Sequence, residues 1–147
     1  MKIVIGAPAN GAELKEEIRK FLEEDERVTS VADLSSPDVT YPDVSISAAD
    51  MIVGGEADRA ILICGTGIGT AIAANKVRGA RAATAHDLIT ARGAVENYDA
   101  QILCMGQNII APAYARALLD VWLDATHDPA GFYGPKVAEI SAFEERR

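Results

Sequence analysis

The chain has few of the residues from which disulfide frameworks and zinc sites are built. Its 147 residues include two cysteines and two histidines. Cys64 and Cys104 form no disulfide framework and no metal-ligand spacing, and His86 and His127 are too few and too scattered to indicate zinc. The sequence therefore predicts no metal centre.

Basic runs and long apolar runs are also missing. The formal net charge is −8 and there is one tryptophan, which argues against nucleic-acid binding. No apolar run is long enough to span a bilayer, and residues 1–6 do not have the pattern of a cleavable secretion signal. We therefore expect a cytoplasmic protein without nucleic-acid or membrane partners. An acidic protein can still bind a phosphate, but only locally, through backbone amides or a few placed cations.

What the chain does contain is a regular alternation of strand and helix patterns. Hydrophobic residues make up 49% and charged residues 24% of the chain, as in a folded globular domain. We expect strands at residues 2–6, 28–34, 60–64, 80–85 and 101–105. We expect helices at residues 11–24, 43–55, 67–76, 87–96, 112–124 and about 135–145, with a proline-containing loop at 35–43. These spacings predict an α/β fold of one domain, residues 1–147, in which a five-stranded parallel sheet lies between two helical layers in an α/β/α arrangement.

The strand at residues 60–64 is continuously apolar, as expected of a central parallel strand buried on both faces. In open α/β sheets ligands bind beyond the carboxyl ends of the strands, so the loop that follows is the first candidate site. This loop reads Cys64-Gly65-Thr66-Gly67-Ile68-Gly69. Its glycines allow a sharp turn close to a ligand. The N–H groups that open the next helix would face an anion and favour the thiolate of Cys64.

The loop has other possible interpretations. A cysteine that ends an apolar strand is more often an inert core thiol. The adjacent Gly-Thr-Gly and the position at a strand end favour a functional role for Cys64, whereas Cys104 lies inside a strand and is expected to be structural. A dinucleotide fingerprint would read G-x-G-x-x-G after the first strand, and this loop reads G-x-G-x-G after the third. A P-loop is also excluded because no lysine precedes Thr70.

Residues 61–83 (ILICGTGIGTAIAANKVRGARAA) resemble the signature of the ribose-5-phosphate isomerase B / galactose-6-phosphate isomerase family. Residues 1–6, 13–18, 41–43, 55–58 and 90–92 fall in family order around it, so the resemblance covers nearly the whole chain. It implies a Rossmann-like sheet, no metal or organic cofactor, and a homodimer with active sites built between subunits, with further pairing into a tetramer left open. It also implies that the helix at about 135–145 packs on the partner subunit.

The family resemblance further implies aldose–ketose isomerisation of a sugar phosphate through an enediolate. In many members a cysteine at the position of Cys64 is the base, and others use a glutamate at the position of Thr70; this chain has the cysteine. Thr66, with the loop amides, would stabilise the enediolate. The loop residues implied in substrate binding are Gly65, Gly67, Ile68 and Gly69.

The chain departs from the family pattern in the substrate pocket. Members that act on pentose phosphates have Asp-His where this chain has Pro8 and Ala9. Their ring-opening histidine corresponds to Asn97, the asparagine beside it to Tyr98, and an arginine after the fifth strand to Asn108. His86, which follows a strand, is a reserve candidate for the missing histidine; a solvated loop histidine is the alternative.

A C-terminal segment that normally carries phosphate-binding arginines corresponds to residues 130–136, where Lys136 is the one aligned cation. Loss of the histidine has a chemical explanation: a tetrose 4-phosphate cannot close a furanose ring, because the hydroxyl it would use carries the phosphate. The hypothesis is therefore an isomerase of altered specificity, such as one that interconverts erythrulose 4-phosphate and erythrose 4-phosphate. The candidate substrate-binding residues outside the loop are Pro8, Ala9, Tyr41, Asn97, Tyr98, Asn108 and Lys136.

Two alternatives stay open at this point. One is a non-catalytic or regulatory relative that binds a sugar phosphate, which the lost Asp-His pair and arginines favour and the retained Cys64 and Thr66 oppose. The other is one subunit of a heteromeric isomerase.

Overall fold

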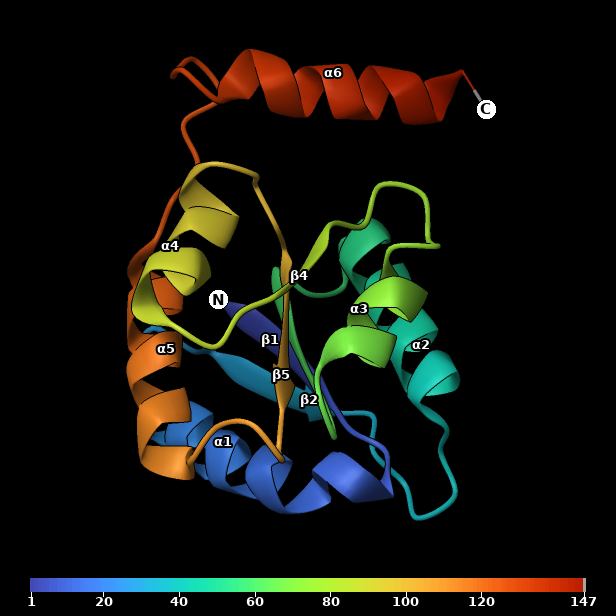
Figure 1. Cartoon of the computed structure of the whole chain (residues 1–147), viewed down its shortest axis with the longest axis vertical. Coiled ribbons are helices and arrows are strands. Elements are labelled where there is room, and N and C mark those ends of the chain that lie inside the picture. Colours follow the sequence, from blue (N-terminus) through green and yellow to red (C-terminus); the bar gives the residue numbers. More distant parts are fainter. Residues whose placement is uncertain (147) are drawn as a thin grey trace.

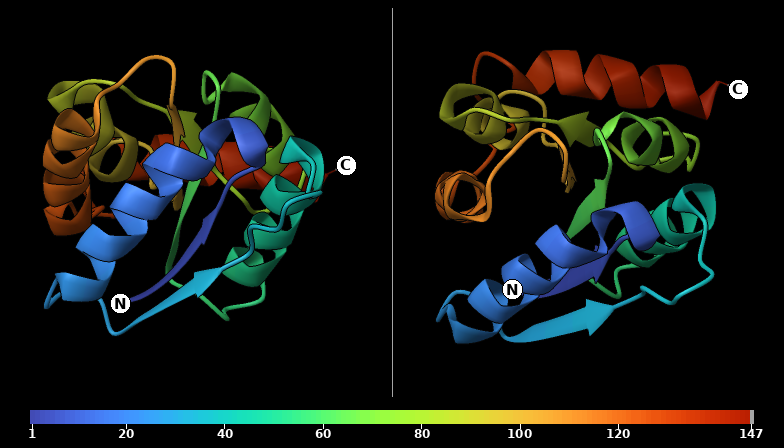
Figure 2. Two further views of the ribbon diagram at one scale, coloured as in Figure 1. Left: turned by 90° about the horizontal axis from the view of Figure 1, so that it is seen from below. Right: turned by 60° about the horizontal axis from the view of Figure 1, so that its bottom comes forward.

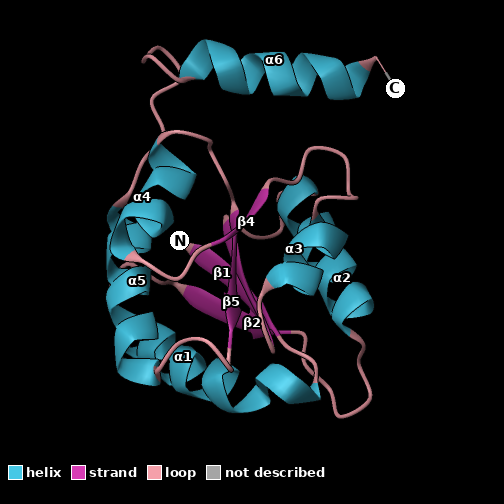
Figure 3. Cartoon of the chain, in the orientation of Figure 1, coloured by secondary structure: helices cyan, strands magenta, loops and turns pink. Residues whose placement is uncertain are grey.

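The computed structural model of the protein describes residues 1–146, which form a five-stranded sheet with helices on both faces (Figures 1 and 3). The strands are β1 (Lys2–Gly6), β2 (Ser30–Asp33), β3 (Arg59–Cys64), β4 (Ala82–Thr84) and β5 (Ile102–Gly106). All neighbouring pairs are parallel, and their order across the sheet is β2-β1-β3-β5-β4. The three-layer α/β/α, Rossmann-like fold with a five-stranded parallel sheet is confirmed. The apolar strand that precedes Cys64 is the central one, as expected.

The helices divide between the two faces of the sheet according to the alternation of side chains along the strands. Ile61 and Ile63 of β3 pack with α1 (Ala12–Glu24), α4 (Leu88–Glu96) and α5 (Pro112–Asp124). Leu62, between them, packs with α2 (Tyr41–Val53) and α3 (Ile68–Ala74) on the other face. Both faces are covered, and this explains why the strand reads as an uninterrupted apolar run.

The boundaries of the expected strands and helices agree with the structure to within two residues, and two of the differences have a clear physical reason. The loop expected at 35–43 is shorter, because α2 begins at Tyr41: the Thr40 side chain caps it by accepting from the Asp43 amide, and Pro42 occupies the first turn. Proline there costs no hydrogen bond, so it marks a helix start rather than a loop. A short 3-10 helix, η1 (Ala9–Gly11), also precedes α1, whereas the sequence analysis expected one helix at 11–24 and assigned no element to residues 7–10.

The last helix, α6 (Gly134–Glu145), agrees with the expected range of about 135–145 and lies apart from the other layers (Figures 1 and 2). Its buried residues are Gly134 and Val137, while Ile140 is 50% exposed. Glu144 accepts a hydrogen bond from the Gly79 amide, which ties the end of α6 to the segment before β4. Among residues 1–146, no helix has the length and apolarity needed to cross a membrane.

Candidate active site at the carboxyl edge of the sheet

The segments that follow β1, β3 and β5 meet around Gly65. A Cβ built on Gly65 would lie 3.2 Å from Nδ2 of Asn10 and 3.2 Å from Nδ2 of Asn108. Asn10 lies in η1, which packs so closely on β3 that a Cβ on Gly11 would be 2.5 Å from the carbonyl oxygen of Ile63. Two side-chain amides from different loops therefore flank the residue directly after Cys64.

Cys64 is the last residue of β3, and its side chain is surrounded by hydrogen-bond donors. Its Sγ accepts from the Gly67 amide at 3.1 Å and lies 3.7 Å from Oγ1 of Thr70. Burial raises the pKa of the Cys64 thiol, but hydrogen bonds from the amides of Thr66, Thr70 and Gly67 and from the Thr70 hydroxyl outweigh it. The net pKa lies below that of an ordinary thiol, so this sulfur is suited to work as a thiolate.

The loop depends on glycine at position 67. Gly67 has a φ of +76°, and a Cβ there would lie 2.8 Å from the backbone carbon of Met105. This left-handed turn directs the Gly67 amide back to the sulfur of Cys64. Thr66, one residue earlier, is exposed, and its Oγ1 accepts from the Ile68 amide at 3.3 Å. Because this contact uses a lone pair of the hydroxyl oxygen, the Thr66 proton remains available for another acceptor.

Three further candidates lie at this edge. Tyr41 opens α2 with its ring against Gly69, whose Cβ would be 3.0 Å from Cε2 of the tyrosine. Pro8 is the residue before η1 and Ala9 is its first residue, so both lie between β1 and Asn10. The structure thus brings Tyr41 and Asn108 to the loop that carries Cys64, and it places Pro8 and Ala9 in the segment that leads to Asn10.

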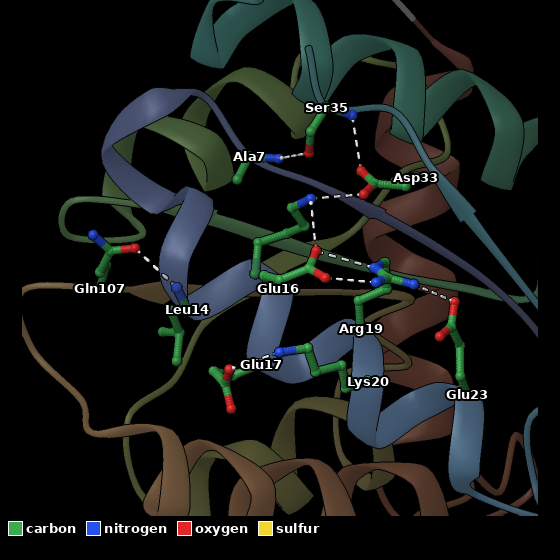
Figure 4. A network of polar contacts seen from close by, with 11 residues as sticks. Ala7, Leu14, Glu16, Glu17, Arg19, Lys20, Glu23, Asp33, Ser35 and Gln107 are labelled. Atoms are coloured by element: carbon green, nitrogen blue, oxygen red, sulfur yellow. Dashed lines mark hydrogen bonds and ion pairs between the residues drawn. The ribbon is translucent and has the colours of Figure 1, made fainter. Parts of the chain in front are cut away.

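A chain of polar contacts holds the segment after β1 in place (Figure 4). The Ala7 amide donates to Oγ of Ser35 at 3.0 Å, and the Ser35 amide donates to Oδ1 of Asp33 at 2.9 Å. Lys15 of α1, which is 9% exposed, donates to Oδ2 of Asp33 at 2.7 Å. Burial raises the pKa of Asp33, but Lys15 and Ser35 together bring it below its ordinary value. The network joins α1, β2 and the start of the site.

His86 is not a solvated loop histidine, and that interpretation was wrong. It follows β4 and is partly buried, and its Nε2 accepts a hydrogen bond from the Gly106 amide at 2.8 Å. Burial lowers the pKa of His86, against a smaller raising effect of Asp87. Gly106 in turn packs on the loop, since its Cβ would lie 2.6 Å from Cα of Thr66. A neutral His86 therefore supports the loop indirectly, through Gly106.

Cys104 is fully buried inside β5, where burial raises its pKa to about 12, and the expected structural role is confirmed. Among the described residues, no group of three or more histidine, cysteine, aspartate or glutamate side chains could hold a metal ion.

Three sequence candidates lie elsewhere in the chain. Helix α4 starts at the carboxyl edge of the sheet and runs back to the amino edge, so Asn97, its C-cap, and Tyr98 are at the end opposite Cys64 (Figure 1). The Tyr98 ring contacts Tyr133 edge to face, with 5.9 Å between centroids. Lys136 donates to the carbonyl of Phe132 at 3.0 Å, and its Nζ lies 3.6 Å from the centroid of that ring. Among the described residues, no hydrogen bond or ring contact joins these three side chains to the loop, although Asn97 and Tyr98 line a cavity of about 300 Å³ together with Thr84 of β4.

A cavity of about 670 Å³ opens on the other side of this edge, between α1 and the segment from Gln107 to Pro112. Its walls are apolar at Leu14 and Ile110 but also carry glutamates, at positions 13, 16 and 17. Carboxylates repel a phosphate, and no residue of the 64–69 loop lines this cavity. The loop around Cys64 is therefore the better candidate for an anionic substrate.

A model of the family described as Ribose/Galactose Isomerase matches residues 3–140. The chain belongs to this family. Among its relatives, the D-erythrulose-4-phosphate isomerase 2 of Mycolicibacterium smegmatis is 48% identical over 98% of this chain and 97% of that protein. The ribose-5-phosphate isomerase B of Escherichia coli is 35% identical over 99% of this chain and 98% of that protein. The solved structure of Clostridium thermocellum ribose-5-phosphate isomerase B superposes with a TM-score of 0.93 at 38% identity, covering 99% of each chain.

Asn10 and Thr84 also lie at this site, and the sequence did not predict them. Asn10 follows the first strand, and its polar amide at a strand end was an available signal. Thr84 ends β4, and its hydroxyl donates to the carbonyl oxygen of Gly67 at 2.8 Å. No sequence pattern specifies that contact, because the two residues are 17 positions apart and meet only through the order of the strands.

Proposed function

We propose that this protein is an aldose–ketose isomerase that acts on a small sugar phosphate through an enediolate, with Cys64 as the base. The observation that carries the proposal is the geometry of Cys64: a sulfur at the end of the central strand, bonded by the Gly67 amide and next to Thr70. A thiolate so placed can remove a proton from a carbon next to a carbonyl. The family relationship supports the same reaction class.

The proposed steps balance without a cofactor. The thiolate of Cys64 takes the proton from C2 of the aldose, or from C1 of the ketose, and becomes a thiol. The electron pair left on carbon forms the enediolate, whose charge rests on oxygen. The remaining hydroxyl proton passes between O2 and O1, and the thiol returns its proton to the neighbouring carbon, so that the carbonyl group ends on the other carbon. The Thr66 hydroxyl, the amides of Gly65 and Gly69, and the side-chain amides of Asn10 and Asn108 are the donors proposed for that oxygen, since the Thr66 and Gly67 amides donate to the sulfur and the Ile68 amide to Thr66.

We further propose a tetrose 4-phosphate as substrate. Support comes from the relative named for D-erythrulose 4-phosphate, which is 48% identical, against 35% for the ribose-5-phosphate isomerase B of E. coli. It also comes from Asn97, which stands where pentose isomerases have the ring-opening histidine. A tetrose 4-phosphate has no furanose form to open, so that histidine is not needed.

The test is turnover of erythrulose 4-phosphate and ribose 5-phosphate by the purified protein and by Cys64→Ala. We expect faster turnover of the tetrose, and loss of turnover in the variant by a factor of at least about 10³ while substrate still binds. Faster turnover of the pentose would contradict the tetrose assignment. Binding without turnover by the unaltered protein would instead favour the sugar-phosphate-binding relative or one half of a heteromeric enzyme.

We also propose that the protein works in the cytoplasm as a homodimer in which Asn97, Tyr98 and Lys136 of one copy complete the site of the other. Support comes from their separation from Cys64 within one chain and from α6, which is mostly exposed and carries Ile140 on its surface. A helix with so little buried surface in its own chain is suited to pack on a second copy.

A further inference from the structure

The peptide unit of Gly67 is held at both of its polar ends. Its N–H donates to Sγ of Cys64 at 3.1 Å. Its carbonyl oxygen accepts from Oγ1 of Thr84 at 2.8 Å and from Oγ1 of Thr70 at 3.2 Å. A carbonyl oxygen has two lone pairs, so both hydroxyls can donate to it at the same time. The shorter contact is the one from Thr84.

Thr70 also lies 3.7 Å from the sulfur of Cys64, within hydrogen-bond range for sulfur. A threonine hydroxyl has one proton and two lone pairs. When Cys64 is a thiol, its S–H can donate to Oγ1 of Thr70, and the Thr70 proton is free to bond Gly67. When Cys64 is a thiolate, the sulfur has no proton to donate, so a hydrogen bond between the two requires Thr70 to donate to sulfur.

We propose that the Thr70 hydroxyl rotates each time Cys64 ionises, so that its O–H donates to the sulfur instead of to the Gly67 carbonyl. Thr84 donates to that carbonyl in both states. Thr84 thereby lowers the free-energy cost of this rotation, because the Gly67 carbonyl oxygen keeps one hydrogen-bond donor when the Thr70 hydroxyl turns to the sulfur. Thr70 is a direct donor to the reacting sulfur, and Thr84 is a positioning residue that acts through Gly67. No covalent bond changes in this step, because the hydroxyl only rotates.

Burial makes this donor effective. Thr70 has 0% exposed surface, and Cys64 has 6%, so water competes little for either group. The titratable group that interacts with the sulfur among the described residues is Cys104 in β5, whose pKa of about 12 keeps it neutral. His86, which follows β4, has its Nε2 bonded to the Gly106 amide rather than to the sulfur. The hydroxyl of Thr70 is therefore the donor near the thiolate that can change its direction, whereas the backbone amides are fixed.

The proposal rests on the role of Cys64 as the base, but its test measures the thiol itself. The rate at which iodoacetamide alkylates Cys64 is followed against pH, with peptide mapping to separate Cys64 from the buried Cys104. We expect Thr70→Val to slow the alkylation of Cys64 at neutral pH on the order of tenfold, because a hydrogen bond to a charged group is lost. Thr70→Ser, which keeps the hydroxyl, should restore the rate.

Variants of Thr84 provide the second half of the test. Because Thr84 is exposed at the end of β4, we expect these variants to fold like the unaltered protein. We expect Thr84→Val to slow alkylation less than Thr70→Val does, and Thr84→Ser to restore it. The double variant should be no slower than Thr70→Val alone, because Thr84 acts only through the proton that Thr70 donates.

Unchanged alkylation profiles in Thr70→Val and Thr84→Val would overturn the proposal, as would fully additive effects in the double variant. The pH dependence of kcat is an independent measurement. In Thr70→Val the rise of kcat with pH should occur at higher pH, with little change in KM. If Cys64→Ala kept its turnover, the proposed function would fail while the alkylation data still tested the hydroxyl arrangement.

Discussion

Gly67 and Gly55 share a left-handed backbone, with φ of +76° and +74°, but differ in their surroundings. A Cβ on Gly55 would meet nothing within 4 Å, whereas one on Gly67 would press on the backbone of Met105. We expect Gly55→Ala to cost about 1 kcal/mol of unfolding free energy from backbone strain alone. Gly67→Ala should cost roughly 3 kcal/mol or more and remove turnover, because it also displaces the amide that faces Cys64. Urea unfolding and kcat measure both effects, and equal costs would contradict this account.

His86 provides a pH dependence at the same scale. Its pKa in the folded chain lies below the ordinary value of 6.5, mainly because of burial. The unfolded chain therefore binds the proton more readily, so the stabilisation is complete above about pH 6.5 and is lost as pH falls through the folded pKa. His86→Gln keeps an acceptor for the Gly106 amide but cannot titrate. We expect this variant to lose less stability than the unaltered protein between about pH 7 and pH 5 in urea unfolding. An equal loss of unfolding free energy in the variant and in the unaltered protein would show that protonation of His86 does not affect stability in this pH range.

At the scale of elements, the segment after β1 depends on contacts made by α1 and β2 rather than on its own residues (Figure 4). Ser35→Ala removes the acceptor of the Ala7 amide, and Asp33→Asn removes the charge that faces Lys15. We expect each to cost about 1–2 kcal/mol of stability and to raise KM, since Asn10 moves with this segment. Lys20→Ala is the matched control, because its pair with Glu17 is exposed on the same helix. A KM unchanged in Ser35→Ala would show that η1 holds its position without the network.

At the scale of the whole molecule, the shared site can be tested by mixing inactive variants. A chain with Cys64→Ala is combined with one in which Asn97, Tyr98 and Lys136 are all changed to alanine. If sites form between subunits, each hybrid dimer has one complete site, so random exchange should restore roughly a quarter of the unaltered turnover.

The matched control pairs Cys64→Ala with Thr66→Ala. Both changes fall on the same loop, so no hybrid dimer has a complete site and turnover should not rise above that of Thr66→Ala alone. Absence of recovery in the first mixture, with exchange of subunits verified by mass, would show that the three residues serve no partner.

The sequence predicted the layers and the central loop because both are local properties. Apolar runs and amphipathic patterns identified the five strands and six main helices, and glycine spacing at the end of the 60–64 strand located Cys64. It misplaced the start of α2, where Thr40 and Pro42 act as a cap and first turn but also have the composition of a loop. It could not recognise η1, because three residues carry no periodicity.

The sequence by itself determined that this is a one-sheet α/β protein with a cysteine in a glycine-rich turn, since each of these is a property of neighbouring residues. Only the tertiary structure decided what surrounds that cysteine. The order β2-β1-β3-β5-β4 brings Asn10, Asn108 and Thr84 to the loop from three separate segments. The physical reason is that strand pairing sets which distant residues meet, and no local pattern encodes that order.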